Sequence, residues 1–202
     1  MKLLSILILT IPGREGLLQA LINRLEPQLT DDVQILIDAR PEISIGAKRN
    51  HLVKSCTGVY CAFIDDDDMV SINYVSKHLD LIHLTNKGLD GIGFKGIMTM
   101  DGKNPQLFIH SAGEEWRAIH SGSINTFYRP LNHLNVVKTY LRRAILFPEV
   151  NHAEDLAQSL EMKQAIDPDK TIDITDEIMY FYNVRTGIST TTKRAKELNQ
   201  KI

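Results

Sequence analysis

The stretch that decides the fold is residues 37–70, "IDARPEISIGAKRNHLVKSCTGVYCAFIDDDDMV". It opens on the end of one apolar run, has helical character over residues 45–56, and returns to an apolar run over residues 59–64. That second run ends directly at four consecutive aspartates, residues 65–68. Because four adjacent like charges repel each other, the pattern predicts either a solvated acidic turn at the next helix or a site for something positive.

The sequence before this stretch repeats the same alternation. Residues 3–10 form a near-continuous β-branched and apolar run, Glu15–Leu25 has apolar residues at helical spacing, and Val33–Asp38 is a second short apolar run. The resulting β-α-β-α-β order predicts a doubly wound sheet. We therefore expect an α/β fold with a mixed, mostly parallel central sheet flanked by helices, in a single domain over residues 1–202.

The sequence after the aspartates is less regular. It predicts a helix from Ser71 or Asn73 to about Thr85 and a turn at "MDGKNPQ", residues 100–106. The other expected elements are strands at Gly91–Met100, 123–128 and 178–182 and helices at 136–145 and 154–166. We expect a ligand-binding half over residues 1–100, a second half over 101–190 and a polar tail over 191–202.

Three strand ends carry polar or loop-forming residues. They are "TIPGR" at residues 10–14, Asp38, and the aspartates at 65–68. In open α/β sheets, ligands bind beyond the carboxyl ends of the strands. The sequence therefore predicts that these three segments gather in one crevice.

Composition narrows the class of protein. The 202 residues carry a net charge of −2, so no global basic field is available to hold nucleic acid. Cys56 and Cys61 are the two cysteines, and we expect buried free thiols in a reducing compartment. The apolar N-terminal run is too short to span a bilayer and lacks a signal-peptide cleavage pattern, which predicts a cytoplasmic protein without a membrane anchor.

Taken as one unit, the deciding stretch resembles the nucleotide-sugar-binding half of family 2 glycosyltransferases with the GT-A fold. The matching features are Asp38 at a strand end, Arg49-Asn50 in a helix, Gly58-Val59-Tyr60 leading a strand, and Asp65-Asp66-Asp67-Asp68. Further on, "NHAEDLAQSL" (151–160) is similar to the family's Glu-Asp motif, and "IMYFYN" (178–183) to its late Tyr-x-Tyr strand. The resemblance is carried by the combination, with residues 1–80 matching best.

The resemblance implies roles at the donor end of the site. A nucleotide-sugar donor, most often a UDP-sugar in this family, would be bound by Thr10, Pro12, Asp38, Lys48, Arg49, Asp65 and Asp66. Asp67, with Asp65, would coordinate Mn²⁺ or Mg²⁺ on the diphosphate, and His152 is the histidine we expect to complete the metal shell. A divalent ion offsets the charge that develops on a diphosphate leaving group.

The resemblance also implies an acceptor end. Asp155 would be the general base that takes the proton of the acceptor hydroxyl, with Glu154 beside it, in a single displacement that inverts the anomeric carbon. Trp116, in the polar stretch "GEEWRAIHSG" (113–122), is our candidate platform for the acceptor. The acceptor itself, a glycan, a protein or modified DNA, is left open by the sequence, as is a homo-oligomeric state.

The chain departs from the family pattern in two places. His152-Ala153 stands where a glycine usually precedes Glu-Asp, and the Gln-x-x-Arg-Trp signature of processive synthases is absent, so we expect a hexosyltransferase that adds one sugar. Two other functions remain open: a nucleotidyltransferase, which would release pyrophosphate, and an inactive nucleotide-sugar or glycan-binding module. Glu154 and Asp155 also fit the simple start of a helix, where acidic residues are favourable.

Overall fold

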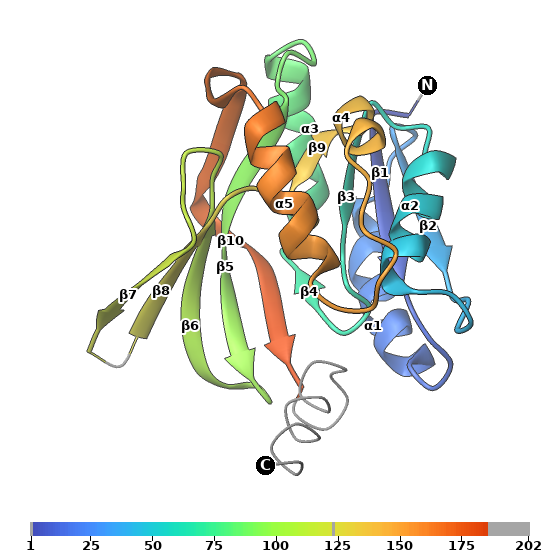
Figure 1. Ribbon diagram of the computed structural model, residues 1–202, viewed down its shortest axis with the longest axis horizontal. Coiled ribbons are helices and arrows are strands. Elements are labelled where there is room, and N and C mark those ends of the chain that lie inside the picture. Colours follow the sequence, from blue (N-terminus) through green and yellow to red (C-terminus); the bar gives the residue numbers. More distant parts are fainter. Residues whose placement is uncertain (1, 123, 186–202) are drawn as a thin grey trace.

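The computed structural model describes residues 2–122 and 124–185, and the strands in those residues form one mixed sheet. The sheet order is β2-β1-β3-β9-β5-β6-β8-β7, with β10 beside β5 and the short β4 beside β10. Most of the paired residues lie in parallel ladders, the longest of which joins β10 to β5. Helices lie on both faces of this sheet, which confirms the expected fold class (Figure 1).

The first half of the chain follows the predicted alternation closely. β1 is the central strand of the parallel trio β2-β1-β3, and its side chains are buried from both faces. Such burial explains why its sequence is apolar throughout instead of alternating. The elements are β1 (Leu4–Leu9), α1 (Glu15–Leu25), β2 (Val33–Asp38), α2 (Ile45–Ser55) and β3 (Tyr60–Phe63), with a 3-10 turn, η1 (Glu26–Gln28), after α1.

The second half extends the sheet beyond β9 through β5, β6, β8 and β7. These four strands, called the wing below, are drawn at the left of Figure 1. Its strands are mostly hairpin partners of one another, whereas β10 returns from the end of the chain to lie parallel to β5. The elements are β4 (Met69–Val70), α3 (Tyr74–Leu84), β5 (Gly91–Met100), β6 (Lys103–His110), β7 (Arg117–Ser121), β8 (Ile124–Arg129), β9 (Val136–Lys138), α4 (Thr139–Ala144), α5 (Glu154–Ala165), η2 (Pro168–Lys170) and β10 (Thr171–Val184).

The structure corrects several predicted elements in this half. The helix expected at 136–145 begins as strand β9, because the buried Val136 and Val137 fill the gap between β3 and β5. The turn expected at 100–106 is confined to Asp101 and Gly102, which have positive φ, and strand β6 begins at once. Strand β7 was not predicted, and β10 begins at Thr171, seven residues before the expected 178.

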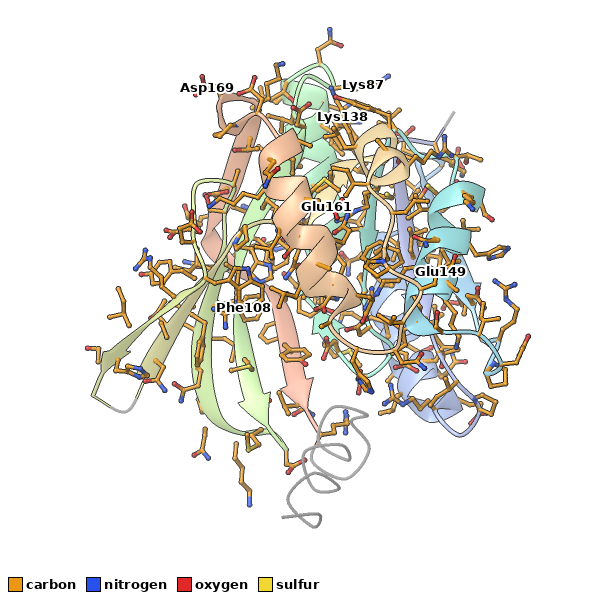
Figure 2. The ribbon with its side chains drawn as sticks, viewed as in Figure 1. Lys87, Phe108, Lys138, Glu149, Glu161 and Asp169 are labelled. Carbon is orange, nitrogen blue, oxygen red and sulfur yellow. The ribbon has the colours of Figure 1, made fainter. Side chains whose placement is uncertain are left out.

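Two layers of helices enclose the core. Leu21 and Leu25 of α1 and Ile82 of α3 pack in the large cluster on one face of the sheet. On the other face, α2 packs over β1 and β3, and Leu141 of α4 meets Met162 of α5. Figure 1 shows α3 behind the sheet and α5 in front of it, where Glu161 is turned away from the sheet (Figure 2). No helix among the described residues has the length and apolar character that crossing a membrane requires.

Both cysteines are free and buried, as predicted. Cys56 ends α2 and Cys61 lies in β3, and both belong to the cluster between α2 and the sheet. They act here as small apolar residues of the core. The polar tail predicted at 191–202 lies outside the described residues.

Candidate active site

A cleft of about 620 Å³ opens at the carboxyl ends of β1 and β3, where the first turn of α5 faces them. These segments lie together at the lower end of the view in Figure 1. The wing supplies the opposite wall, and Phe108 of β6 lies among the side chains between the wing and α5 (Figure 2). A volume of this size is in the range of small-molecule and cofactor sites.

Ten of the twelve site residues expected from the sequence line this cleft. They are Thr10, Lys48, Arg49, Asp65, Asp66, Asp67, Trp116, His152, Glu154 and Asp155. They come from α2, from the segments after β1 and β3, from the residue before β7, and from the first turn of α5 with the loop before it. The fold brings them to one place from positions up to 145 residues apart. The predicted gathering of the first and third strand ends is confirmed by this lining.

Pro12 and Asp38 are not among the residues that line the cleft. Pro12 is exposed in the turn between β1 and α1. Asp38 is buried at the end of β2, where Arg40 donates to it from Nε at 3.0 Å and His51 lies 3.2 Å away. The Arg40 hydrogen bonds lower the pKa of Asp38. A nucleotide base would reach this carboxylate only if Arg40, whose side chain is 43% exposed, moved aside.

The four consecutive aspartates have four different surroundings. Asp66 is buried and accepts hydrogen bonds from Thr10 Oγ1 at 2.6 Å and Arg14 Nη1 at 2.7 Å. Asp68 is buried on the other side of the run, where Tyr180 Oη donates to it at 2.8 Å. β4 separates the run from α3, so the aspartates do not form the first turn of that helix. The interpretation as a simple helix-capping turn is therefore not supported.

Asp65 and Asp67 are the members of the run that face the cleft with partly exposed carboxylates. Burial opposes ionisation of Asp65, but the nearby His133 ring and the charge of Arg49 hold its pKa well below the usual range. Asp67 shows the reverse: burial outweighs Arg14, 3.6 Å away, and with the charges of Asp65 and Asp66 raises its pKa. An additional cation beside Asp67 would offset that repulsion.

These carboxylates fit a divalent cation only in part. Within residues 2–122 and 124–185, no group of three or more His, Cys, Asp or Glu side chains is arranged to hold a metal ion. Both oxygens of Asp66 are taken by Thr10 and Arg14, which leaves Asp65 and Asp67 as the carboxylates of the aspartate run that are open to the cleft. A hard cation here would take its remaining ligands from water and from a bound phosphate, as Mg²⁺ commonly does in phosphate sites.

Arg49 joins the two halves of the site. It lies on α2, with its Nε 3.3 Å from Glu154 Oε1 and its Nη2 3.5 Å from Asp65 Oδ1. Its guanidinium also lies over the rings of Phe63 and Phe147, at 4.9 and 5.5 Å. Glu154 and Arg49 are both buried, so each charge depends on the other. This pair fixes the first turn of α5 against Asp65 and leaves Asp155, 39% exposed, to face the cleft.

Lys48 supplies a second cation on the same wall. Its Nζ donates to the backbone oxygen of Thr10 at 3.0 Å. Burial lowers the pKa of the ammonium, although the charges of Asp38 and Asp66 act to raise it. The side of the cleft formed at the ends of β1 and β3 thus combines three cations with three aspartates: Arg14, Lys48 and Arg49 with Asp65, Asp66 and Asp67. This mixture can meet an anion through its cations and a metal through its carboxylates.

The wing carries a wall of different chemistry. The guanidinium of Arg129 lies 4.2 Å from the ring of Trp116 and 5.4 Å from that of Phe127, and all three side chains line the cleft. Trp116 is 41% exposed. No carboxylate of the described residues lies within ion-pair distance of Arg129. This wall offers aromatic faces together with the guanidinium of Arg129.

The sequence assigned no site role to three charged or titratable residues of the cleft that matter to its chemistry. Arg14, Arg129 and His133 lie in it, but the sequence favoured His152 among the histidines and left Arg14 unassigned. The signal for Arg14 was its position after the first strand end, in "TIPGR", where parallel sheets place ligand contacts. No local pattern marks His133, because its neighbours in the site come from residues 65 and 155.

Comparison with solved structures identifies the architecture. Residues of S. aureus TarS 1–349 match with a TM-score of 0.62 and 16% identity over 91% of this chain and 60% of that chain. The same protein in complex with UDP matches with a TM-score of 0.57 and 15% identity over 92% and 61% of the two chains. Its complex with UDP-GlcNAc matches with a TM-score of 0.56 and 14% identity over 91% and 58%. The fold is a GT-A-like α/β fold.

These similarities extend to the fold and no further, because the identities are low. The chain spans 37% of the length of the larger S. aureus TarS chain that it matches. No protein-family model matches the sequence, and no curated protein matches it. Membership of glycosyltransferase family 2 therefore stays a prediction.

Proposed function

We propose that the protein is a metal-dependent, inverting glycosyltransferase that moves one hexose from a UDP-sugar to an acceptor hydroxyl. The observation that carries this proposal is the shared cleft of Asp67, at the end of β3, and Asp155, at the start of α5. The GT-A-like fold and the structural neighbour solved with UDP-GlcNAc support a nucleotide-sugar donor. A cytoplasmic location and a homo-oligomeric state stay predictions.

At the donor end, Asp67 and Asp65 would hold Mn²⁺ or Mg²⁺, with His152 on the α5 side of the cleft as the remaining candidate ligand. The ion would offset the charge that develops on the diphosphate as the bond to the sugar breaks. Lys48, Arg49 and Arg14 line the same wall and would add positive charge around the phosphates. Thr10 would line the nucleotide pocket, Pro12 would meet the nucleotide from the exposed turn after β1, and Asp38 would be reached after Arg40 moves.

At the acceptor end, Asp155 would take the proton of the attacking hydroxyl. Its partial exposure suits contact with a substrate, whereas the buried Glu154 is fixed by Arg49 and would orient the start of α5. Attack from the Asp155 side while the diphosphate leaves on the other side inverts the anomeric carbon. Trp116, with Arg129 stacked on it, would form the platform for a sugar or other ring of the acceptor.

The test is donor hydrolysis, with water in the place of the acceptor. Purified protein is incubated with Mn²⁺ and UDP-GlcNAc, UDP-glucose or UDP-galactose, and the released UDP is quantified. We expect release from one donor, lowered at least about 100-fold by Asp67→Ala and abolished by a chelator. Asp176→Ala, which removes an exposed carboxylate paired with Lys77 and outside the cleft, is the matched control.

Other outcomes would favour the other functions. Pyrophosphate release from a nucleoside triphosphate with a sugar phosphate would indicate a nucleotidyltransferase. Binding of UDP-sugars by calorimetry without any hydrolysis or transfer would indicate a binding module. The proposal would be contradicted if the protein neither hydrolysed nor bound any nucleotide or nucleotide-sugar.

A further inference from the structure

His133 lies between the donor-end and acceptor-end carboxylates of the cleft. Its Nε2 is 3.7 Å from Asp65 Oδ2, and its Nδ1 is 3.7 Å from Asp155 Oδ2. The residue is 6% exposed, and neither ring nitrogen has a hydrogen-bond partner within reach. Two buried, unsatisfied nitrogens that each face a carboxylate from slightly beyond hydrogen-bond distance are costly unless they close in another state of the protein.

The backbone that carries His133 is held rigidly. The guanidinium of Arg142 is fully buried and donates from Nη2 to the carbonyl oxygens of Asn132, His133 and Asn135, at 2.7, 3.2 and 2.7 Å. Arg142 Nη1 also lies 3.5 Å from Gln158 Oε1 on α5. The loop between β8 and β9 is thereby fixed relative to the helix that carries Asp155.

The ring itself is confined by its neighbours. It lies 6.5 Å from the ring of Phe63, the last residue of β3, and the Phe63 N–H donates to the His133 carbonyl oxygen at 3.0 Å. The ring therefore belongs to a rigid wall shared by β3, the β8–β9 loop and α5. A shift of about 1 Å in either carboxylate side chain would bring it within hydrogen-bond distance of a ring nitrogen. Hydrogen bonds in active sites are often long until a ligand is bound.

We propose that His133 is a positioning residue that binds the Asp155 carboxylate through Nδ1 and holds it in the orientation that accepts the acceptor proton. This inference rests on the glycosyltransferase function proposed above. In this arrangement one oxygen of Asp155 is held by His133 and the other is left to face the acceptor hydroxyl. The contact of Nε2 with Asp65 connects this orientation to the carboxylate next to the donor phosphates.

Three substitutions of His133 distinguish the contribution of Nδ1 from that of Nε2. The amide nitrogen of an asparagine side chain reaches roughly where Nδ1 lies, and that of glutamine roughly where Nε2 lies, whereas alanine offers neither donor. The variants are therefore His133→Asn, His133→Gln and His133→Ala. kcat and KM are measured for hydrolysis of UDP-GlcNAc, or of whichever UDP-sugar the wild type hydrolyses, and UDP binding is measured by calorimetry with Mn²⁺.

We expect kcat to fall about 10- to 100-fold in His133→Gln and His133→Ala, while His133→Asn stays within about fivefold of the wild type. KM and the affinity for UDP should change by less than about threefold in all three, because the carboxylates that face the donor are kept. His120→Asn on β7, outside the cleft, is the control substitution and should leave both constants unchanged. Thermal unfolding confirms that each variant is folded.

Three results would overturn the inference while the proposed function stands: all variants keep the wild-type kcat, all lose UDP binding together with kcat, or His133→Gln keeps kcat while His133→Asn loses it. Failure of the proposed function has a different signature. In that case the wild type itself binds no UDP or hydrolyses no UDP-sugar, and the role of His133 is refuted with it.

Discussion

At the scale of single residues, the aspartate run shows how position along a backbone divides one residue type into several roles. Asp66 and Asp68 turn inward and serve as acceptors for Thr10 and Tyr180. Asp65 and Asp67 turn to the cleft, and their pKa values are shifted in opposite directions. The charge repulsion evident in the sequence is thus met by buried donors for half of the run and by arginines for the rest.

Ala153 is a second residue whose conformation matters. It precedes Glu154 with φ of 59° and ψ of 16°, the left-handed region in which a Cβ costs about 1–2 kcal/mol. We expect Ala153→Gly to raise the free energy of unfolding by about 0.5–1 kcal/mol, after the larger unfolded-state entropy of glycine is subtracted. Urea denaturation measures this change.

Ala157→Gly is the matched control for that prediction. It makes the same substitution four residues later, inside α5, where glycine should lower the free energy of unfolding by about 0.5–1 kcal/mol. Opposite signs at the two positions would establish the strain at Ala153. A loss of stability at both would show that the left-handed conformation costs the native protein nothing.

At the scale of elements, the sequence predicted those whose burial pattern is local. β1, α1, β2 and α2 begin and end within a residue or so of the expected positions, because their apolar pattern follows one period throughout. β6 was missed because Pro105 and Asn104, which has positive φ, suggest a turn. The pairing of β5 with β6 shifts register between Met98 and Met100, and the bulge this creates on β6 contains Asn104 and Pro105. Proline is tolerated in such a bulge.

The start of β10 and the type of β9 were mispredicted for a different reason. Polar residues at 173, 175–177 interrupt the apolar pattern of β10, and its pairing with β5 shifts register in that same region. Val136 and Val137 fit a helical pattern as well as a strand until their neighbours β3 and β5 are known. The same limit applies to the site. The residues of one motif could be predicted, but the contact of Arg14 with Asp66 spans 52 positions of sequence and that of His133 with Asp65 spans 68.

Arg142 shows how one side chain joins elements. It is fully buried on α4 and serves three backbone carbonyls of the β8–β9 loop. We expect Arg142→Ala to lower the free energy of unfolding by about 3–5 kcal/mol, because three buried acceptors and a large cavity remain. Urea denaturation measures the loss.

The adjacent Arg143 provides the comparison for this effect. Arg143 is exposed and donates two hydrogen bonds, to the carbonyl oxygens of Val53 and Cys56. We expect Arg143→Ala to lower the free energy of unfolding by about 1 kcal/mol. Equal losses for the two variants would refute the assignment of Arg142 as the residue that fixes the loop.

At the scale of the whole molecule, burial of histidines in the core couples stability to pH. His78 packs between Tyr74 and Phe94, and burial lowers its pKa to about 4; burial likewise lowers the pKa of His110 to about 3. Both values lie below the ordinary value of 6.5. Between pH 6.5 and 4 the unfolded chain therefore binds protons that the native protein does not, and stability falls as the pH falls through this window.

Asp68 acts in the opposite sense, because burial and the charge of Asp65 raise its pKa well above the ordinary range. Its contribution therefore favours the folded state at lower pH.

The histidine contribution is isolated by comparing the wild type with His78→Phe, which keeps a ring of similar size and cannot titrate. From pH 7 to pH 5, the wild type should lose about 2 kcal/mol more than this variant, since a shift of one pKa unit corresponds to about 1.4 kcal/mol. Urea denaturation of both proteins at the two pH values gives the difference directly. Equal losses would mean that His78 is protonated in the native core, where a charged ring beside Phe94 would need a partner for the otherwise unpaired Nε2.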